Sequence, residues 1–250
     1  YTHSGNRKKQ NFNIDDYPKF KDKIIYILVE TEPDDLYETG PHADDRVGRI
    51  RLNSLKRIRK QYNSLVEGVT DASENDLILL SDCDEIPNLE NLNKENLNNE
   101  IILFNQKIFY YKFNLQHTSL NWFGTKGCKK KKLRTFEWLR NIKNKKYNIF
   151  RLDKYFSKTY YSKFKIIRNG GWHFGWLRNS DEIIQKINSY AHTEHNIDQN
   201  NNKNYIEDCM DKNISFLNNN EKLLLNEEID FLPKYILKNI DLYRKWIKEK

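Results

Sequence analysis

Short apolar runs predict most of the strands in this chain. The four aliphatic residues at 77–80 are continuous rather than alternating, which is typical of a strand buried on both faces of a parallel or mixed sheet. Residues 23–29, 101–104, 108–113 and 164–167 are similarly rich in aliphatic and aromatic side chains. These runs predict an α/β protein built on a largely buried sheet.

Apolar residues at three- and four-residue steps predict the helices. In residues 44–65 this spacing follows Asp44 and Asp45, which are placed to cap the first turn. A strand at 23–29, this helix and the strand at 77–80 have the order of a βαβ unit. Further helices are expected at 89–97, from a cap at Thr135, at 180–192 with Ser180 as cap, at 205–217 and at 232–247.

Composition adds bounds on the class of protein. A chain of 250 residues is long enough for one core, so we expect a single domain over residues 1–250. The 43 Lys and Arg residues exceed the 35 Asp and Glu residues, giving a net charge of +8 that favours anionic partners. An aromatic share of 13% argues against disorder.

The cysteines and the apolar windows bear on location. Cys83, Cys128 and Cys209 are far apart and form no Cys-x-x-Cys, which excludes a zinc ribbon and indicates a reducing compartment. No window of 18 uncharged apolar residues exists, so we expect no membrane span in this piece. We therefore expect a cytoplasmic protein, and the abundance of Asn and Lys suggests a viral or bacterial source. An anchor upstream of Tyr1 is left open.

The strand at 77–80 ends abruptly in acids, and this is the first candidate site. If the backbone stays extended, Asp82 and Asp84 project to the same side. A divalent ion is the usual partner of two carboxylates that lie so near each other. Glu85 adds a third acid, and Pro87 ends the extended run. A bare Asp-x-Asp is more often a solvated turn or a helix cap, but the buried strand before it favours a metal site.

The second candidate is the segment 169–176, NGGWHFGW. Its glycines allow a backbone that other residues avoid and present His173 between bulky aromatic residues. Imidazole is a ligand for manganese-type ions, which also bind carboxylates, although a lone His is more often a core or surface residue. Trp172 beside it and Lys126, in the glycine loop 121–127, are candidates for contact with an anionic cofactor. The lysine run that ends at Lys132 is either a solvated charge run or a phosphate contact.

With these pieces together, the chain resembles glycosyltransferase family 17, which includes the β-1,4-mannosyl-glycoprotein N-acetylglucosaminyltransferases. The likeness lies in the THSG, KDKIIYILV, SDCDEIP and NGGWHFGWL segments and in their order. The family pattern normally starts earlier, with a strand and a helix upstream. The resemblance implies a GT-A (Rossmann-like) fold with a mostly parallel mixed sheet flanked by helices. It also implies UDP-N-acetylglucosamine as donor and inversion at the anomeric carbon.

The resemblance further implies roles for single residues. Asp82 and Asp84 would hold Mn²⁺ or Mg²⁺ against the donor diphosphate, and His173 would complete the metal shell. An inverting transfer also needs a general base for the acceptor hydroxyl. Glu137 is the first candidate because it follows the glycine loop, and Glu194 and Asp153 are its rivals. For Glu137 the ordinary alternative is an acid stabilised by the helix N-terminus.

Two other hypotheses stay open. A transferase of the same fold could use another nucleotide sugar, since donor choice depends on a few hydroxyl contacts. A basic module that binds glycans or nucleic acid without catalysis would also suit the lysines and aromatic residues. Of these we favour the transferase, with a glycan or glycoprotein acceptor and no nucleic-acid partner. The oligomeric state is not indicated.

Overall fold

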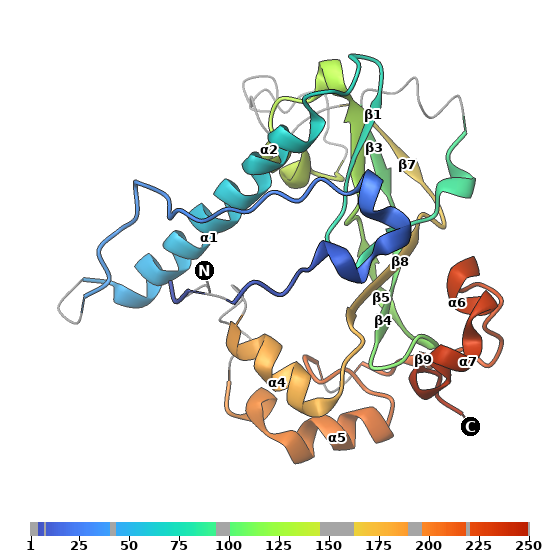
Figure 1. The fold of residues 1–250 in the computed structure, drawn as a ribbon. Coiled ribbons are helices and arrows are strands. Elements are labelled where there is room, and N and C mark those ends of the chain that lie inside the picture. The colour runs from blue at the N-terminus through green and yellow to red at the C-terminus, as the bar shows by residue number, and fades with distance from the viewer. Residues whose placement is uncertain are drawn as a thin grey trace, which may run out of the picture.

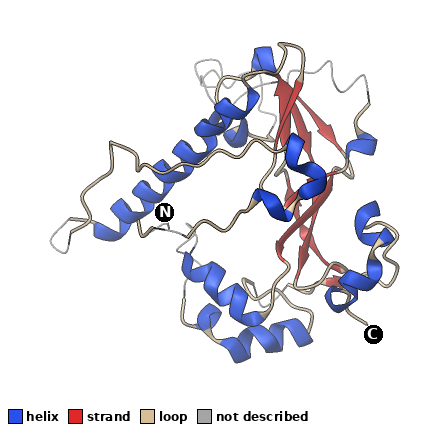
Figure 2. Cartoon of the chain, viewed as in Figure 1, coloured by secondary structure: helices blue, strands red, loops and turns tan. Residues whose placement is uncertain are grey.

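The computed structural model describes residues 5–7, 9–40, 44–93, 101–145, 163–189, 197–218 and 221–249. Its strands form two mixed sheets, and helices pack against both of them (Figure 1; Figure 2). This confirms the expected α/β class.

The first sheet has four strands in the order β1-β6-β3-β7. Strand β6 lies antiparallel between β1 and β3, and β3 is parallel to β7. The strands are β1 (Leu77–Leu80), β3 (Ile101–Phe104), β6 (Lys126–Lys129) and β7 (Phe164–Ile167). Three of them match the apolar runs at 77–80, 101–104 and 164–167, whereas β6 begins inside the expected glycine loop 121–127 and extends past its end.

The second sheet has the order β2-β8-β4-β5-β9, and only β4 and β8 are parallel. Its strands are β2 (Glu85–Pro87), β4 (Gln106–Tyr110), β5 (Leu115–Trp122), β8 (Gly171–Trp176) and β9 (Leu224–Leu225). Of the seven strand pairings in the described part of the chain, five are antiparallel. The expectation of a mostly parallel sheet is therefore wrong for these residues, because only the β3–β7 and β4–β8 pairs are parallel.

The two sheets lie end to end because four strands of one continue into four strands of the other (Figure 1). The connections are residues 81–84, 105, 123–125 and 168–170. Asn105 N–H donates to the Ile167 carbonyl at 3.0 Å, and the Asn105 carbonyl accepts from Gly170 N–H at 2.7 Å. We call this line of connections the seam. Because the acidic turn is one of the four connections, the seam is where the candidate site lies.

Helices cover the sheets through three apolar clusters. Helices α1 and α2 pack on the first sheet, α4 and α5 pack on one face of the second, and α6 and α7 pack on its other face. Their bounds are α1 (Arg46–Ser64), α2 (Phe136–Asn141), α4 (Ser180–Ser189), α5 (Lys203–Asp211), α6 (Lys234–Lys238) and α7 (Ile240–Tyr243). Among the described helices, none combines the length and the apolar character needed to cross a bilayer.

The expected strand at 23–29 is absent, and so is the βαβ unit that it would have started. Lys23 ends a 3-10 helix, and the residues after it run extended without pairing to any described strand. Ile25 and Leu28 are 64% and 50% exposed. An apolar run forms a strand only where a neighbour supplies backbone hydrogen bonds, and the pattern alone does not test for that neighbour.

Helix ends follow capping chemistry more closely than periodicity. Asp45 caps α1 by accepting from Gly48 N–H at 3.2 Å, and Thr135 caps α2 by accepting from Trp138 N–H at 3.0 Å. The cap of α4 is Asn179 rather than Ser180, since the Asn179 side chain accepts from Glu182 N–H. The expected long helices are shorter in the described residues: 89–91 is a 3-10 turn, α5 ends at Asp211, and 232–247 breaks into α6, α7 and a 3-10 turn.

Candidate functional site

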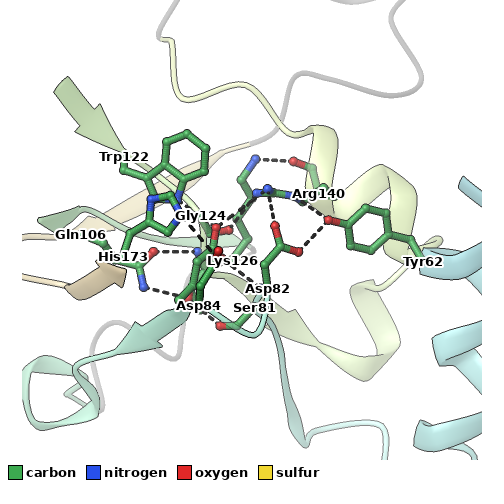
Figure 3. A network of polar contacts seen from close by, with 12 residues as sticks. Tyr62, Ser81, Asp82, Asp84, Gln106, Trp122, Gly124, Lys126, Arg140 and His173 are labelled. Atoms are coloured by element: carbon green, nitrogen blue, oxygen red, sulfur yellow. Dashed lines mark hydrogen bonds and ion pairs between the residues drawn. The ribbon is translucent and has the colours of Figure 1, made fainter. Parts of the chain in front are cut away.

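The acidic segment turns at the seam instead of staying extended. Glu85 N–H donates to the Asp82 carbonyl at 3.0 Å, which closes a tight turn between β1 and β2. The carboxylates of Asp82 and Asp84 therefore meet different partners instead of projecting to one side (Figure 3). The expected extended geometry is wrong because β1 and β2 belong to different sheets and the chain must change direction between them.

Asp82 is bound to the helices of the first sheet. One carboxylate oxygen accepts from the Tyr62 hydroxyl at 2.7 Å, and the other accepts from the Arg140 guanidinium at 2.7 Å (Figure 3). Arg140 Nε also donates to the Tyr62 oxygen at 3.0 Å, so the three side chains form a closed triangle. Burial raises the pKa of Tyr62, which keeps its hydroxyl protonated as the donor to Asp82.

Asp84 faces the second sheet. Its Oδ1 lies 3.6 Å from His173 Nε2, and its Oδ2 lies 3.4 Å from the Lys186 ammonium of α4. The approach of Asp84 to His173 follows from pairing of β2 with β8, in which Glu85 lies opposite His173. The two sequence segments singled out above thus meet in space, although 89 positions separate these side chains. Lys186 also donates to the Gly175 carbonyl and lies over the Trp176 ring.

His173 is held in a neutral, largely buried position. Burial lowers its pKa from the ordinary 6.5 to about 4, and the neighbouring Asp84 carboxylate opposes this shift without overcoming it. The Trp122 indole stacks on the imidazole, with centroids 4.4 Å apart and planes at 12°. The neutral ring therefore has a lone pair available on one nitrogen at neutral pH.

The buried Glu85 side chain stabilises the turn between β1 and β2. It is 5% exposed, and its carboxylate accepts from Trp122 Nε1 at 2.8 Å and from Asp82 N–H at 3.1 Å. Burial raises its pKa. A Cβ on Gly124 would lie 2.0 Å from a Glu85 oxygen, so only glycine fits at that point of the seam. The third acid of the motif therefore supports the site instead of lining it.

The donor set around Asp84 can be compared with what a divalent ion needs. No group of three or more His, Cys, Asp or Glu side chains suited to a metal occurs among the residues that the structure describes. Asp84 and His173 supply two donors, and a Cβ on Gly175 would lie 2.6 Å from His173 Nε2 and 3.5 Å from Asp84 Oδ2. The glycine thus leaves space in front of both donors. Two protein ligands and open space fit an ion that completes its shell with substrate oxygens.

Two predicted site residues, Lys126 and Trp172, have other roles in the structure. Lys126 is 6% exposed, and its ammonium donates to the carbonyls of Arg140 and Ile142 at the end of α2, which lowers its availability to a ligand. Burial lowers its pKa to about 8. Trp172 packs on the opposite side of β8 and donates to the Phe231 carbonyl at 3.0 Å.

Of the three candidate bases, Glu137 alone lies within the described residues. The Glu137 carboxylate accepts from Arg59 at 2.9 Å in the first turn of α2, which matches the ordinary interpretation of a helix-end acid. Asp153 and Glu194 lie outside the described residues.

Sequence reasoning missed Arg140, Trp122 and Lys186. All three are partners of the motif acids or of His173, yet each comes from a distant element: α2, β5 and α4. Only the glycine at position 124 gave a local signal for one of them, because a glycine loop indicates a close approach and Gly124 packs against Trp122 and Glu85. The lysine run is also structural in part, since Lys130 donates to the carbonyls of Thr70 and Ala72.

Comparison of the chain with protein-family models, with curated proteins and with solved structures found no match.

Proposed function

We propose that this chain is a metal-dependent, inverting glycosyltransferase that moves N-acetylglucosamine from UDP-N-acetylglucosamine to a glycan hydroxyl. The observation that carries the proposal is the approach of Asp84 to His173, at 3.6 Å, across the β2–β8 pairing. Those two residues come from the two segments that resemble glycosyltransferase family 17. We also propose that the mixed α/β fold is a GT-A variant, in which a ligand would lie where strands end at the seam.

The charges around the pair suit a diphosphate leaving group. Asp84 and His173 would hold Mn²⁺ or Mg²⁺, and the bound ion would supply Lewis-acid stabilisation of the departing UDP. Lys186 lies 3.4 Å from Asp84 and adds a cation on the same side. Trp122 holds the His173 ring by stacking and is itself held by Glu85, so the imidazole is fixed before a ligand arrives.

Asp82 has a different part in this proposal from the one its motif implies. Its two oxygens already bind Tyr62 and Arg140, so it orients the guanidinium instead of ligating the ion. Arg140 would then offer a fixed planar donor to hydroxyl oxygens of the substrate near the seam. The general base, by contrast, rests on sequence alone, with Glu137, Asp153 and Glu194 as candidates.

Of the two competing hypotheses, the same contacts disfavour only the non-catalytic binding module. A module that binds nucleic acid through its lysines needs exposed ammonium groups, and Lys126 and Lys130 donate instead to backbone carbonyls. A transferase with another donor sugar fits the site equally well, because the diphosphate contacts are common to all nucleotide sugars.

The proposal is tested by a screen of UDP- and GDP-sugars with Mn²⁺, following nucleotide release. We expect release with UDP-N-acetylglucosamine and a loss of at least ~100-fold in Asp84→Asn, the size typical of a lost electrostatic contact in a transition state. The matched control is Asp241→Asn, because the Asp241 carboxylate is 88% exposed and pairs only locally with Arg244. Equal activity of both variants, or Mn²⁺-independent turnover, would refute the metal assignment.

A further inference from the structure

A hollow of about 190 Å³ lies next to the site, between the end of β5 and the end of α2. Its wall includes two aromatic side chains, Trp122 and Phe123, two amides, Asn121 and Asn144, and the Arg140 guanidinium. One buried water needs about 10–15 Å³ by this measure, so the hollow has room for several waters or for one sugar ring. Aromatic surface with a few fixed polar groups is the usual lining of a small-molecule site.

Arg140 lines this hollow, and its hydrogen bonds to the residues around it use only part of its donor capacity. A guanidinium carries five N–H groups. The contacts to Tyr62, Asp82 and the Gly124 carbonyl use one each, the last at a long 3.4 Å. Because Asp82 and Tyr62 hold the guanidinium in place, the remaining N–H groups have a fixed direction. Lys126 also lines the hollow, but its ammonium is bound to backbone carbonyls.

The charge balance decides what kind of ligand fits. The two cations of the wall, Arg140 and Lys126, are matched by two acids: Asp82 lies 2.7 Å and Glu85 lies 3.8 Å from the Arg140 guanidinium. An anionic ligand would compete with Asp82 for the same guanidinium and would be repelled by both carboxylates. Neutral hydroxyl groups, which accept from N–H and donate to amide oxygens, meet no such penalty.

We propose that this hollow is a subsite for a single neutral pyranose. Its role rests on the proposed function: the ring would belong to the acceptor glycan. Trp122 lines the hollow and stacks on His173, so only its indole ring would separate the bound sugar from the Asp84–His173 pair. Asn121 and Asn144 at the exposed rim then select among hydroxyl positions.

The test uses ligand-observed NMR on the full chain, without nucleotide or metal, with a panel of methyl hexopyranosides. We expect saturation transfer to at least one neutral pyranoside. In Asn144→Ala we expect its affinity to fall about fivefold, the effect of one lost hydrogen bond. Asn144 is exposed at the rim, so the substitution leaves the core intact. The matched control, Asn204→Ala in α5, removes the same amide from an exposed position of a helix that does not line the hollow and should bind as the unmodified chain does.

Several results would overturn the subsite. They are no transfer to any pyranoside, an equal loss in both variants, or tighter binding of glucuronate or glucose 1-phosphate than of the neutral sugar. The two proposals fail separately. Sugar binding that depends on Asn144 without turnover of any nucleotide sugar refutes the proposed function and leaves the subsite standing. Turnover with an acceptor KM that Asn144→Ala does not change refutes the subsite alone.

Discussion

The buried, neutral state of His173 makes the stability of the protein depend on pH. The folded chain resists protonation of this imidazole until the pH approaches about 4, whereas in the unfolded chain it takes up a proton near 6.5. Between these values the unfolded state binds more protons, so the free energy of unfolding falls as the pH falls. The stabilisation by the neutral ring is complete above pH 6.5 and is lost progressively towards pH 4.

The size of the effect follows from the two pKa values. At 1.36 kcal/mol per pKa unit, the difference between 6.5 and about 4 corresponds to about 3 kcal/mol below pH 4, of which about 2 kcal/mol is already lost at pH 5. The His173 side chain is 13% exposed, so solvent screens this effect only weakly. That loss is a large fraction of the ~5–15 kcal/mol stability of an ordinary domain.

The assay is urea denaturation between pH 7.5 and 4.5 in EDTA, comparing the unmodified chain with His173→Gln. Both carry the same other titratable groups, so the difference between their unfolding free energies isolates the imidazole. We expect this difference to shrink by about 2 kcal/mol as the pH falls from 7.5 to 5. Parallel profiles would refute the burial argument. A difference that grows on acidification would mean that His173 is protonated and paired with Asp84 in the folded chain.

Three further predictions concern residues of β8 and β6, the strands that adjoin the seam. Gly175→Ala places a Cβ 2.6 Å from His173 Nε2, and we expect an at least ~10-fold weaker Mn²⁺ response in the thermal shift with UDP; an unchanged Mn²⁺ midpoint would contradict the metal site. Gly171→Ala, at φ +127° with a Cβ 2.0 Å from the Ile86 carbonyl, should lower the free energy of unfolding by at least ~1–3 kcal/mol in urea, and unaltered stability would contradict this close approach of β8 to β2. Lys126→Met should cost ~1–3 kcal/mol of stability with UDP affinity unchanged, because it leaves two carbonyls without their donor; weaker UDP binding at unchanged stability would restore its role as a phosphate contact.

The parts of the fold that sequence predicted are those with a strong local pattern. Strand β1 and helix α1 are marked by a continuous apolar run and by a regular helical spacing, each within one segment. Strand β5 was not predicted, because its residues from Thr118 to Asn121 are exposed and its apolar and polar residues do not alternate. Strand β6, KGCK, has residues that are depleted in strands, yet it is buried because β1 and β3 flank it on both sides.

The sequence predicted only those residues of the candidate site that lie in a distinctive local motif. Asp84 and His173 stood out because each follows or lies within an unusual local motif, and β2–β8 pairing then brings them together. The Asp82–Arg140 contact spans 58 positions and depends on how α2 returns to the seam, which no local pattern encodes. Long-range packing also explains Lys126. Its place in a glycine loop indicated a phosphate contact, but its ammonium donates to the Ile142 carbonyl after α2.

The seam divides the motif acids between two mechanical halves of the molecule. Asp82 is tied through Tyr62 and Arg140 to the helices of the first sheet, and Asp84 approaches His173 and Lys186, which belong to the second sheet and its helix. Any bending along the seam therefore changes the separation of the two carboxylates directly. A ligand that contacts both carboxylates would link the two sheets and restrict bending between them. The protein would then be more rigid with this ligand bound than without it.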